Sequence, residues 1–235
     1  MKTVAMKTIV KQYWLRGDRF LVLLILLVGT MLLVPMVGSP LVQKILWDAC
    51  LTLVFVAAAL ANRHRQRIFT TAVVLAVIAI ALAWSRLVTD YAELRVLGLV
   101  ADVVFFAFTA VMILAAVVRD RMGSTQAISG AVCVYLLLGL GWAHGYLLIE
   151  QAESEPFRFT ERRVDSADAS GDQRTALSQM IYYSFVTMTT LGYGDVTPRT
   201  PLAQTVTWMQ AVTGQLFLAV LIARLVSELP SMSRR

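Results

Sequence analysis

The chain is poor in cysteine and in charge. It has only two cysteines, and 15% of its 235 residues are charged. Cys50 and Cys133 both fall inside long apolar stretches, where a cysteine is more often a small packing residue than half of a disulfide or a metal ligand. No catalytic triad, paired pocket carboxylates, metal-ligand cluster or phosphate loop can be recognised in the sequence. We therefore expect neither an enzyme nor a bound cofactor.

Apolar residues, in contrast, are abundant. They make up 58% of the chain, and the mean hydropathy is +0.69, so a lipid bilayer is the expected solvent. A membrane-spanning helix needs about 20 mostly apolar residues. Six stretches qualify as candidate spans: 20–37, 45–61, 69–87, 96–118, 127–149 and 202–226. The sequence thus predicts an all-α membrane protein.

A seventh apolar stretch, residues 176–190, is too short and too rich in hydroxyl groups to cross a bilayer. Such a segment is tolerated at membrane depth when protein surrounds it or when it lines a cavity. We expect a re-entrant helix here.

The net charge of +6 does not indicate a nucleic-acid partner, since no basic face with interleaved aromatic residues is present. Basic residues instead alternate with the candidate spans. The positive-inside rule then places both termini in the cytoplasm and the protein in the cell membrane. The basic segments contain Lys2, Lys7, Lys11, Arg16 and Arg19, then Arg63, Arg65 and Arg67, then Arg119 and Arg121, and finally Arg234 and Arg235.

Residues 189–195, Thr-Thr-Leu-Gly-Tyr-Gly-Asp, are the most informative stretch, and we call them the glycine loop. Gly192 and Gly194 can adopt backbone conformations closed to other residues. Such a backbone can turn successive carbonyl oxygens toward one axis, where they can replace the water around a cation. The Thr190 hydroxyl can add another oxygen, while Tyr193 is expected to point away from that axis.

The glycine loop resembles the signature of tetrameric potassium channels, in which valine stands at the position of Leu191. Residues 182–188 resemble the end of the pore helix in that family, and residues 196–198 resemble the exit after the filter. The resemblance implies that the carbonyls of Thr190, Leu191, Gly192 and Tyr193 bind potassium, with the Thr190 hydroxyl innermost. Gly194 would cap the outer end.

The filter sequence occurs once in the chain, and a ring of carbonyls needs several copies around one axis, so the resemblance implies a homotetramer. The expected organisation is a basic cytoplasmic N-terminus, a four-span bundle and a pore domain, at 1–19, 20–122 and 123–235. Within the pore domain we expect a span, an outer loop, a pore helix, the filter and a last span, at 127–149, 150–175, 176–189, 190–194 and 202–226.

The outer loop, residues 150–175, is rich in charge of both signs. It is either a solvated turret without a specific role or a source of negative charge that raises the local cation concentration. Its charged residues are Glu150, Glu153, Glu155, Glu161, Asp165, Asp168 and Asp172 with Arg158, Arg162, Arg163 and Arg174.

The resemblance assigns support of the filter to Tyr182, Tyr183 and Asp195. Some bacterial members carry a buried glutamate at the position of Val186, which could form a carboxyl pair with the aspartate. Because this chain lacks that glutamate, we predict that a hydrogen bond from Tyr182 or Tyr183 to Asp195 holds the outer filter.

Gly214 lies at the position of the family's hinge glycine. It either permits bending or lets two helices pack closely. In helical register, Leu218, Ile222 and Val226 follow on one face. These side chains either form an apolar gate or pack against the fifth span, and Gln215 is a further candidate for lining the cavity.

The first four spans lack a voltage sensor. Residues 96–118 contain no lysine or arginine, whereas a sensor needs about 3–4 gating charges in each subunit. Asp48 and Asp102 are the acids inside spans, and Asp102 could pair with Arg86 or Arg95. We favour an ion pair that fixes helix packing, or a carboxyl that reaches outer water, over a functional acid. His144 is expected to be a packed, hydrogen-bonded residue.

The residues and the resemblance together predict a potassium-selective channel that conducts passively as a homotetramer with little or no voltage sensing. The alternatives are a potassium transporter subunit and a non-conducting membrane protein with a pore fold. Few residues follow the last span, so we expect the regulator to be a separate protein, lipid or membrane tension, or the filter itself, or to be absent.

Overall fold

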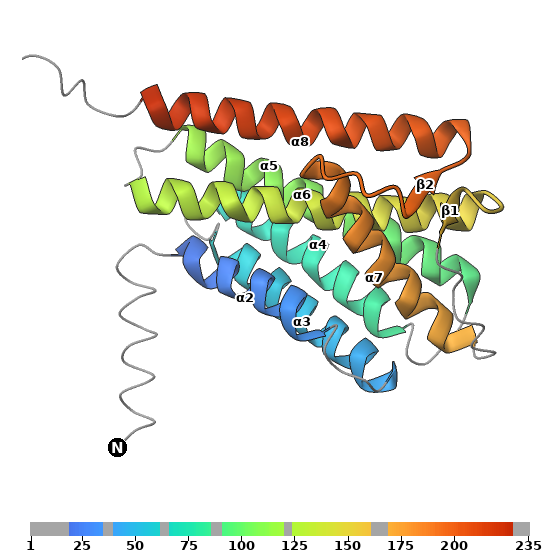
Figure 1. Ribbon diagram of the computed structural model, residues 1–235. Helices are drawn as coiled ribbons and strands as arrows, with labels where there is room; N and C mark the ends of the chain where they lie inside the picture. The colour runs from blue at the N-terminus through green and yellow to red at the C-terminus, as the bar shows by residue number, and fades with distance from the viewer. Residues whose placement is uncertain are drawn as a thin grey trace, which may run out of the picture. The chain divides into compact units, whose positions relative to one another are not determined.

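The computed structural model describes residues 19–34, 40–61, 66–85, 91–119, 124–160 and 169–227. Within them the chain is almost entirely helical, as expected, with two short strands in addition. The elements, in chain order (Figure 1), are α2 (Arg19–Leu33), α3 (Pro40–Ala61), α4 (Gln66–Ser85), α5 (Ala92–Arg119), α6 (Ser124–Ala152), β1 (Phe157–Phe159), α7 (Ala169–Met188), β2 (Val196–Pro198) and α8 (Pro201–Ser227).

Two compact units divide the chain, residues 1–141 and 142–235. In the first unit, α2 packs on α3, α3 on α4, and α4 on α5. The ring of Phe55 lies 4.1 Å from that of Phe105 and 5.8 Å from that of Phe106, which joins α3 to α5. One face of α4 is lined by buried small residues at helical spacing, which let neighbouring helices approach closely: Ala72, Ala76, Ala79 and Ala83.

The first part of α6 also belongs to this unit. A Cβ added to Gly130 would lie 2.8 Å from Val117, and one added to Gly141 would lie 3.4 Å from Phe106. Glycine at these positions therefore brings α6 close to α5. The division between the units lies at Gly141, inside α6, and the domain boundary expected near residue 123 stays a prediction.

Three described helices are long and apolar enough to cross a membrane: Ala92–Val118, Gln126–Ala152 and Pro201–Arg224. The helices Phe20–Leu33, Ile45–Ala58 and Phe69–Ser85 are apolar but shorter. These lengths support a membrane protein, while the six spans stay a prediction. The orientation of the termini also stays a prediction, since residues 1–18, Arg63, Arg65, Arg121, Arg234 and Arg235 lie outside the described residues.

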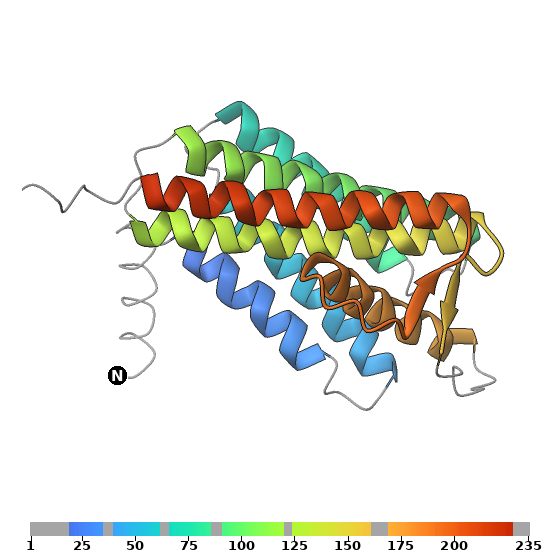
Figure 2. The same ribbon diagram turned by 45° about the horizontal axis from the view of Figure 1, so that its top comes forward.

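The second unit contains the end of α6 and every element from β1 to α8. β1 pairs antiparallel with β2 in the register Phe157↔Pro198, Arg158↔Thr197 and Phe159↔Val196. Figure 2 shows the two strands side by side, with the glycine loop running from the end of α7 into β2.

The segment expected to be an outer loop, residues 150–175, is more regular than the sequence suggested. α6 continues to Ala152, β1 follows, and α7 already begins at Ala169. The strand escaped sequence analysis because three residues are too few to establish an alternating pattern. Glu161, Arg162, Arg163, Asp165 and Asp168 of this segment lie outside the described residues.

Candidate functional site

The glycine loop has a positive φ at every second residue. The φ angles of Thr190, Gly192 and Gly194 are 61°, 53° and 78°, whereas Leu191 and Tyr193 have no positive φ. Glycine adopts such angles without penalty, but a threonine there is strained. Alternation of this kind can turn successive carbonyls to the same side of the chain, which a carbonyl-lined ion site requires.

The loop folds back on the last turn of α7. The backbone N–H of Thr190 donates to the Thr187 carbonyl at 3.1 Å. The amides of Leu191 and Gly192 both donate to the Val186 carbonyl, at 3.0 and 3.4 Å. These bonds satisfy carbonyls that the end of a helix leaves without an intrahelical partner.

The same bonds give the direction of the carbonyls in the loop. A peptide group is planar and trans, so its C=O points opposite to its N–H. Since the amides of Leu191 and Gly192 point toward Val186, the carbonyls of Thr190 and Leu191 point away from it. Two of the four predicted potassium-binding carbonyls are thereby directed away from the end of α7.

The side chains of the loop are not covered by their own chain. Leu191 is 59% exposed and Tyr193 is 67% exposed, and Thr190, Gly192 and Gly194 are exposed as well. Among the described residues, therefore, the side chains of this loop are mostly left uncovered.

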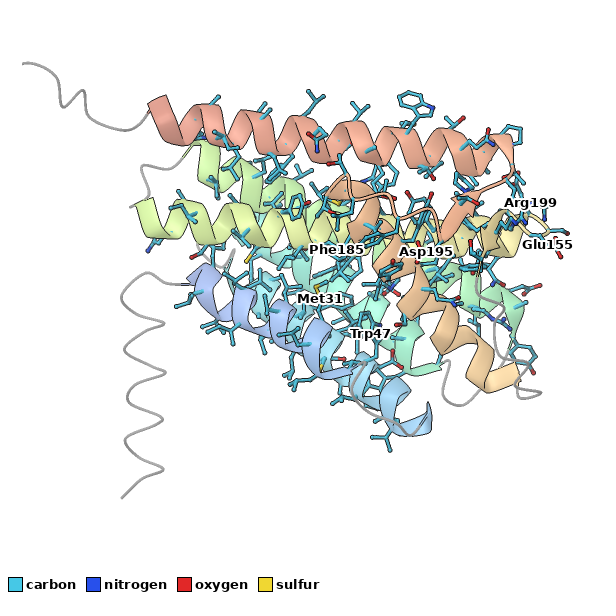
Figure 3. The ribbon with its side chains drawn as sticks, viewed as in Figure 1. Met31, Trp47, Glu155, Phe185, Asp195 and Arg199 are labelled. Carbon is cyan, nitrogen blue, oxygen red and sulfur yellow. The ribbon has the colours of Figure 1, made fainter. Side chains whose placement is uncertain are left out.

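The predicted hydrogen bond to Asp195 is present, and Tyr182 is its donor. Tyr182 Oη lies 2.7 Å from Asp195 Oδ2, and Asp195 Oδ1 accepts the backbone N–H of Val196 at 3.1 Å. Figure 3 shows Asp195 at the end of the loop that leads into β2. The bond to the carboxylate, with desolvation and the nearby negative charge adding to it, raises the pKa of Tyr182 to about 12, because ionisation would remove the shared proton.

Tyr183 has different partners from Tyr182. Its side chain is 5% exposed, and its Oη lies 3.0 Å from Thr207 Oγ1 on α8. Its ring lies 5.0 Å from that of Tyr146 and 5.5 Å from that of Phe157. Tyr183 therefore joins the pore-helix candidate α7 to α6, α8 and β1, and it has no hydrogen bond to Asp195 among those described.

A buried polar network behind α7 was not predicted from the sequence. Tyr146 Oη donates to Gln210 Oε1, and Gln210 Nε2 donates to the carbonyl and hydroxyl oxygens of Ser184 at 3.1 and 2.6 Å. All three side chains are fully buried. The available signal was a glutamine inside an apolar span, since polar residues at membrane depth usually have a specific partner. The sequence analysis instead singled out Gln215, which is exposed.

Gly214 is buried at a close approach between α8 and the end of α7. A Cβ at this position would lie 3.1 Å from the Met188 carbonyl oxygen and 3.3 Å from Met188 Cα. Of the two roles left open for Gly214, close packing is therefore observed, and bending stays a prediction.

The other gate candidates follow Gly214 along α8. Leu218 is half-buried and Ile222 is 59% exposed, while the side chain of Val226 lies outside the described residues. Their role in a gate stays a prediction.

The acids of the first unit are buried. Asp48 is 5% exposed and Asp102 is 1% exposed, so the suggestion that the Asp102 carboxyl reaches outer water is wrong within this fold. Arg86, one of its two suggested partners, lies outside the described residues.

In the second unit His144 is 2% exposed, in agreement with a packed histidine.

Comparison with known proteins supports an ion channel. Residues 146–230 match the model of a family described as "Ion channel". Over 63 residues, 27% of the chain, the sequence is 36% identical to "Two-pore potassium channel 4" of Arabidopsis thaliana, and the match covers 22% of that relative. No solved structure matches the chain.

The family match falls on the part of the chain that contains the glycine loop. The two comparisons support an ion channel in a membrane. The matched region covers the second unit almost completely.

Proposed function

We propose that the protein is a potassium-selective channel that conducts passively across the cell membrane as a homotetramer. The observation that carries this proposal is the backbone of the glycine loop. Positive φ angles alternate along it at Thr190, Gly192 and Gly194, and its amides are bonded back to α7. A side-chain hydrogen bond alone could not produce this arrangement.

In this proposal the glycine loop is the selectivity filter. Potassium binds to the carbonyls of Thr190, Leu191, Gly192 and Tyr193, with the Thr190 hydroxyl as the innermost ligand and Gly194 at the outer end. None of these side chains is charged. Carbonyl oxygens can offset the loss of water from the ion and still release it, which conduction requires.

The tetramer is supported by what a single chain leaves exposed. One chain supplies one glycine loop, so a closed ring needs several copies. Only 11% of the most apolar stretch of α8 is buried within the chain. Its exposed apolar side chains can lie against other copies or lipid: Leu202, Trp208, Met209, Val212, Leu216, Val220 and Ile222.

Little or no voltage sensing is proposed because α5 carries basic residues only near its ends, at Arg95 and Arg119. Their side chains can reach the headgroups instead of crossing the membrane field. Closure would then occur at the filter or at an apolar gate formed by Leu218, Ile222 and Val226.

Flux of potassium through the purified full-length protein in liposomes tests the proposal. We expect potassium flux that exceeds sodium flux and is blocked by barium. Gly192→Ala should abolish selectivity, because alanine is strained at a φ of 53° although nothing lies within 4 Å of the added Cβ. Leu191→Val is the matched control in the same loop and should conduct like the wild type.

Two outcomes would contradict the proposal. A folded tetramer without potassium flux would indicate a non-conducting pore fold. Potassium movement that requires a counter-ion gradient and resists barium would indicate a transporter subunit.

A further inference from the structure

The strand β1 of the outer loop is tied to the segment that leaves the glycine loop. We propose that β1 is a second brace of the proposed filter, and that it positions Asp195 independently of Tyr182. This inference deepens the proposed function and rests on it, although part of its test does not need conduction.

Asp195 is held from two directions. Its carboxylate accepts the Tyr182 hydroxyl from α7 at 2.7 Å. Its backbone carbonyl accepts the N–H of Thr160, the residue after β1, at 2.8 Å. Asp195 directly follows Gly194, whose φ is 78°. The outer end of the loop therefore cannot reorient as a unit without breaking at least one of these two bonds.

The pairing between β1 and β2 is closed at both ends. Thr160 bonds to Asp195 at one end, and the Arg199 N–H donates to the Pro156 carbonyl at 2.7 Å at the other. Three residue pairs lie between these bonds. Because the ladder begins immediately after the loop, its register fixes where the chain leaves the loop.

β1 is itself anchored in the core of the second unit. Phe157 is 4% exposed, and its ring meets Tyr146 at 5.3 Å and Tyr183 at 5.5 Å, both edge to face. Such aromatic pairs add about 0.5–1.5 kcal/mol beyond the area they bury. Tyr183 lies next to Tyr182 on α7, so the brace returns to the helix that bears the first support. β1, α7 and the segment that follows the glycine loop therefore all contact one another around the outer end of the loop.

An exposed ion pair lies beside the strands but is not expected to be the main contributor. Arg199 Nη1 lies 2.9 Å from Glu155 Oε2, and the two side chains are 55% and 81% exposed (Figure 3). Exposed pairs of this kind stabilise little. Thr200 also donates a hydrogen bond to Glu153. These contacts occupy Glu155 and Glu153, two of the outer-loop acids proposed as a source of negative charge.

A proline at position 160 tests the brace with little other disturbance. Thr160→Pro removes the N–H that bonds to Asp195, and the preceding residue, Phe159, is already in the extended conformation that proline favours in its neighbour. Thr160→Ala is the matched control, because it changes the same exposed side chain and keeps the N–H. Both variants are made in the full-length protein in lipid nanodiscs.

Amide hydrogen exchange and flux are then compared. Loss of one hydrogen bond should speed exchange of the Leu191 and Gly192 amides about fivefold in Thr160→Pro relative to Thr160→Ala. The ratio of potassium to sodium flux should fall in the same variant. Equal exchange and equal selectivity in the two variants would overturn the proposal.

The outcomes separate the brace from the channel function. If the wild type does not conduct, the proposed function fails, but the exchange rates still decide whether β1 orders the loop. If Thr160→Pro does not fold, Phe157→Leu provides the test, since it keeps the backbone ladder and removes only the aromatic anchor. Faster exchange at Leu191 and Gly192 supports the brace, and wild-type exchange contradicts it.

Discussion

At the scale of single residues, Tyr182 and Tyr183 show how neighbours in one helix acquire different roles. Consecutive helical residues point about 100° apart, because a turn contains about 3.6 residues. Tyr182 therefore reaches Asp195 while Tyr183 reaches Thr207. One hydroxyl holds the end of the glycine loop, and the other holds α7 against α8.

Tyr182→Phe removes the donor to Asp195, and we expect it to lower the selectivity for potassium over sodium. Tyr183→Phe should leave selectivity closer to that of the wild type, since its hydroxyl bonds to Thr207 instead. Loss of one such bond corresponds to about 1 kcal/mol. Flux ratios of both variants in liposomes give the measurement, and an unchanged ratio in Tyr182→Phe would show that this bond does not hold the filter.

Gly214→Ala tests the close approach between α8 and the end of α7. The new Cβ would meet Met188 backbone atoms at 3.1 and 3.3 Å, so the helices must separate, at a cost of about 1–3 kcal/mol. The gain in helix propensity, about 1 kcal/mol, offsets only part of that cost.

Gly145→Ala in α6 is the matched control for this prediction, because nothing lies within 4 Å of its added Cβ. Thermal unfolding in detergent should show a lower Tm for Gly214→Ala and an equal or higher Tm for Gly145→Ala. Equal stability of Gly214→Ala and the wild type would mean that the approach is looser than described.

At the scale of secondary-structure elements, the second unit is organised around α7. Tyr146 of α6, Ser184 of α7 and Gln210 of α8 form one buried hydrogen-bond network. A buried polar network favours one arrangement of its members, because each unsatisfied group is costly. The network therefore fixes how α8 meets the helix that ends at the glycine loop.

Gln210→Leu should destabilise the second unit. The change removes the hydrogen bonds that Gln210 makes with the buried Tyr146 hydroxyl and with Ser184, at a cost of about 1–3 kcal/mol. Gln215→Leu is the control on the same helix, because Gln215 is exposed. Thermal unfolding in detergent measures both variants, and equal Tm values would show that the network contributes little.

At the scale of the whole molecule, the described residues of one chain leave much apolar surface exposed. The glycine loop and most of the apolar surface of α8 are uncovered, although the proposed filter requires carbonyls from several directions. In the proposed channel, this exposed surface would lie against other copies of the chain.

Native mass spectrometry of the protein released from nanodiscs is expected to give four copies of the 26.0 kDa chain. The physical reason is that four glycine loops can close a ring whose carbonyls replace the water shell of potassium. A stable monomer or dimer that still conducts potassium selectively would contradict the homotetramer.

The sequence alone was sufficient for features whose chemistry is local. Alternating glycines predicted an unusual backbone at Gly192 and Gly194, and positive φ angles occur there. The resemblance to potassium channels, with the lack of a glutamate at position 186, predicted a tyrosine bond to Asp195, and Tyr182 makes it. Apolar composition predicted helices, and helices dominate the described residues.

Only the tertiary structure decided the contacts between distant segments. The pairing of β1 with β2 and the Gln210 network depend on residues that meet after the helices pack, and no local pattern encodes those partners. The approach of Gly214 to Met188 was likewise one of two roles that the sequence left open. The backbone freedom of glycine is a property of the residue itself, so the sequence predicted the unusual conformation of the glycine loop. A hydrogen-bond partner in a distant segment depends on how the helices and strands pack, so the sequence did not predict the contacts that support the loop.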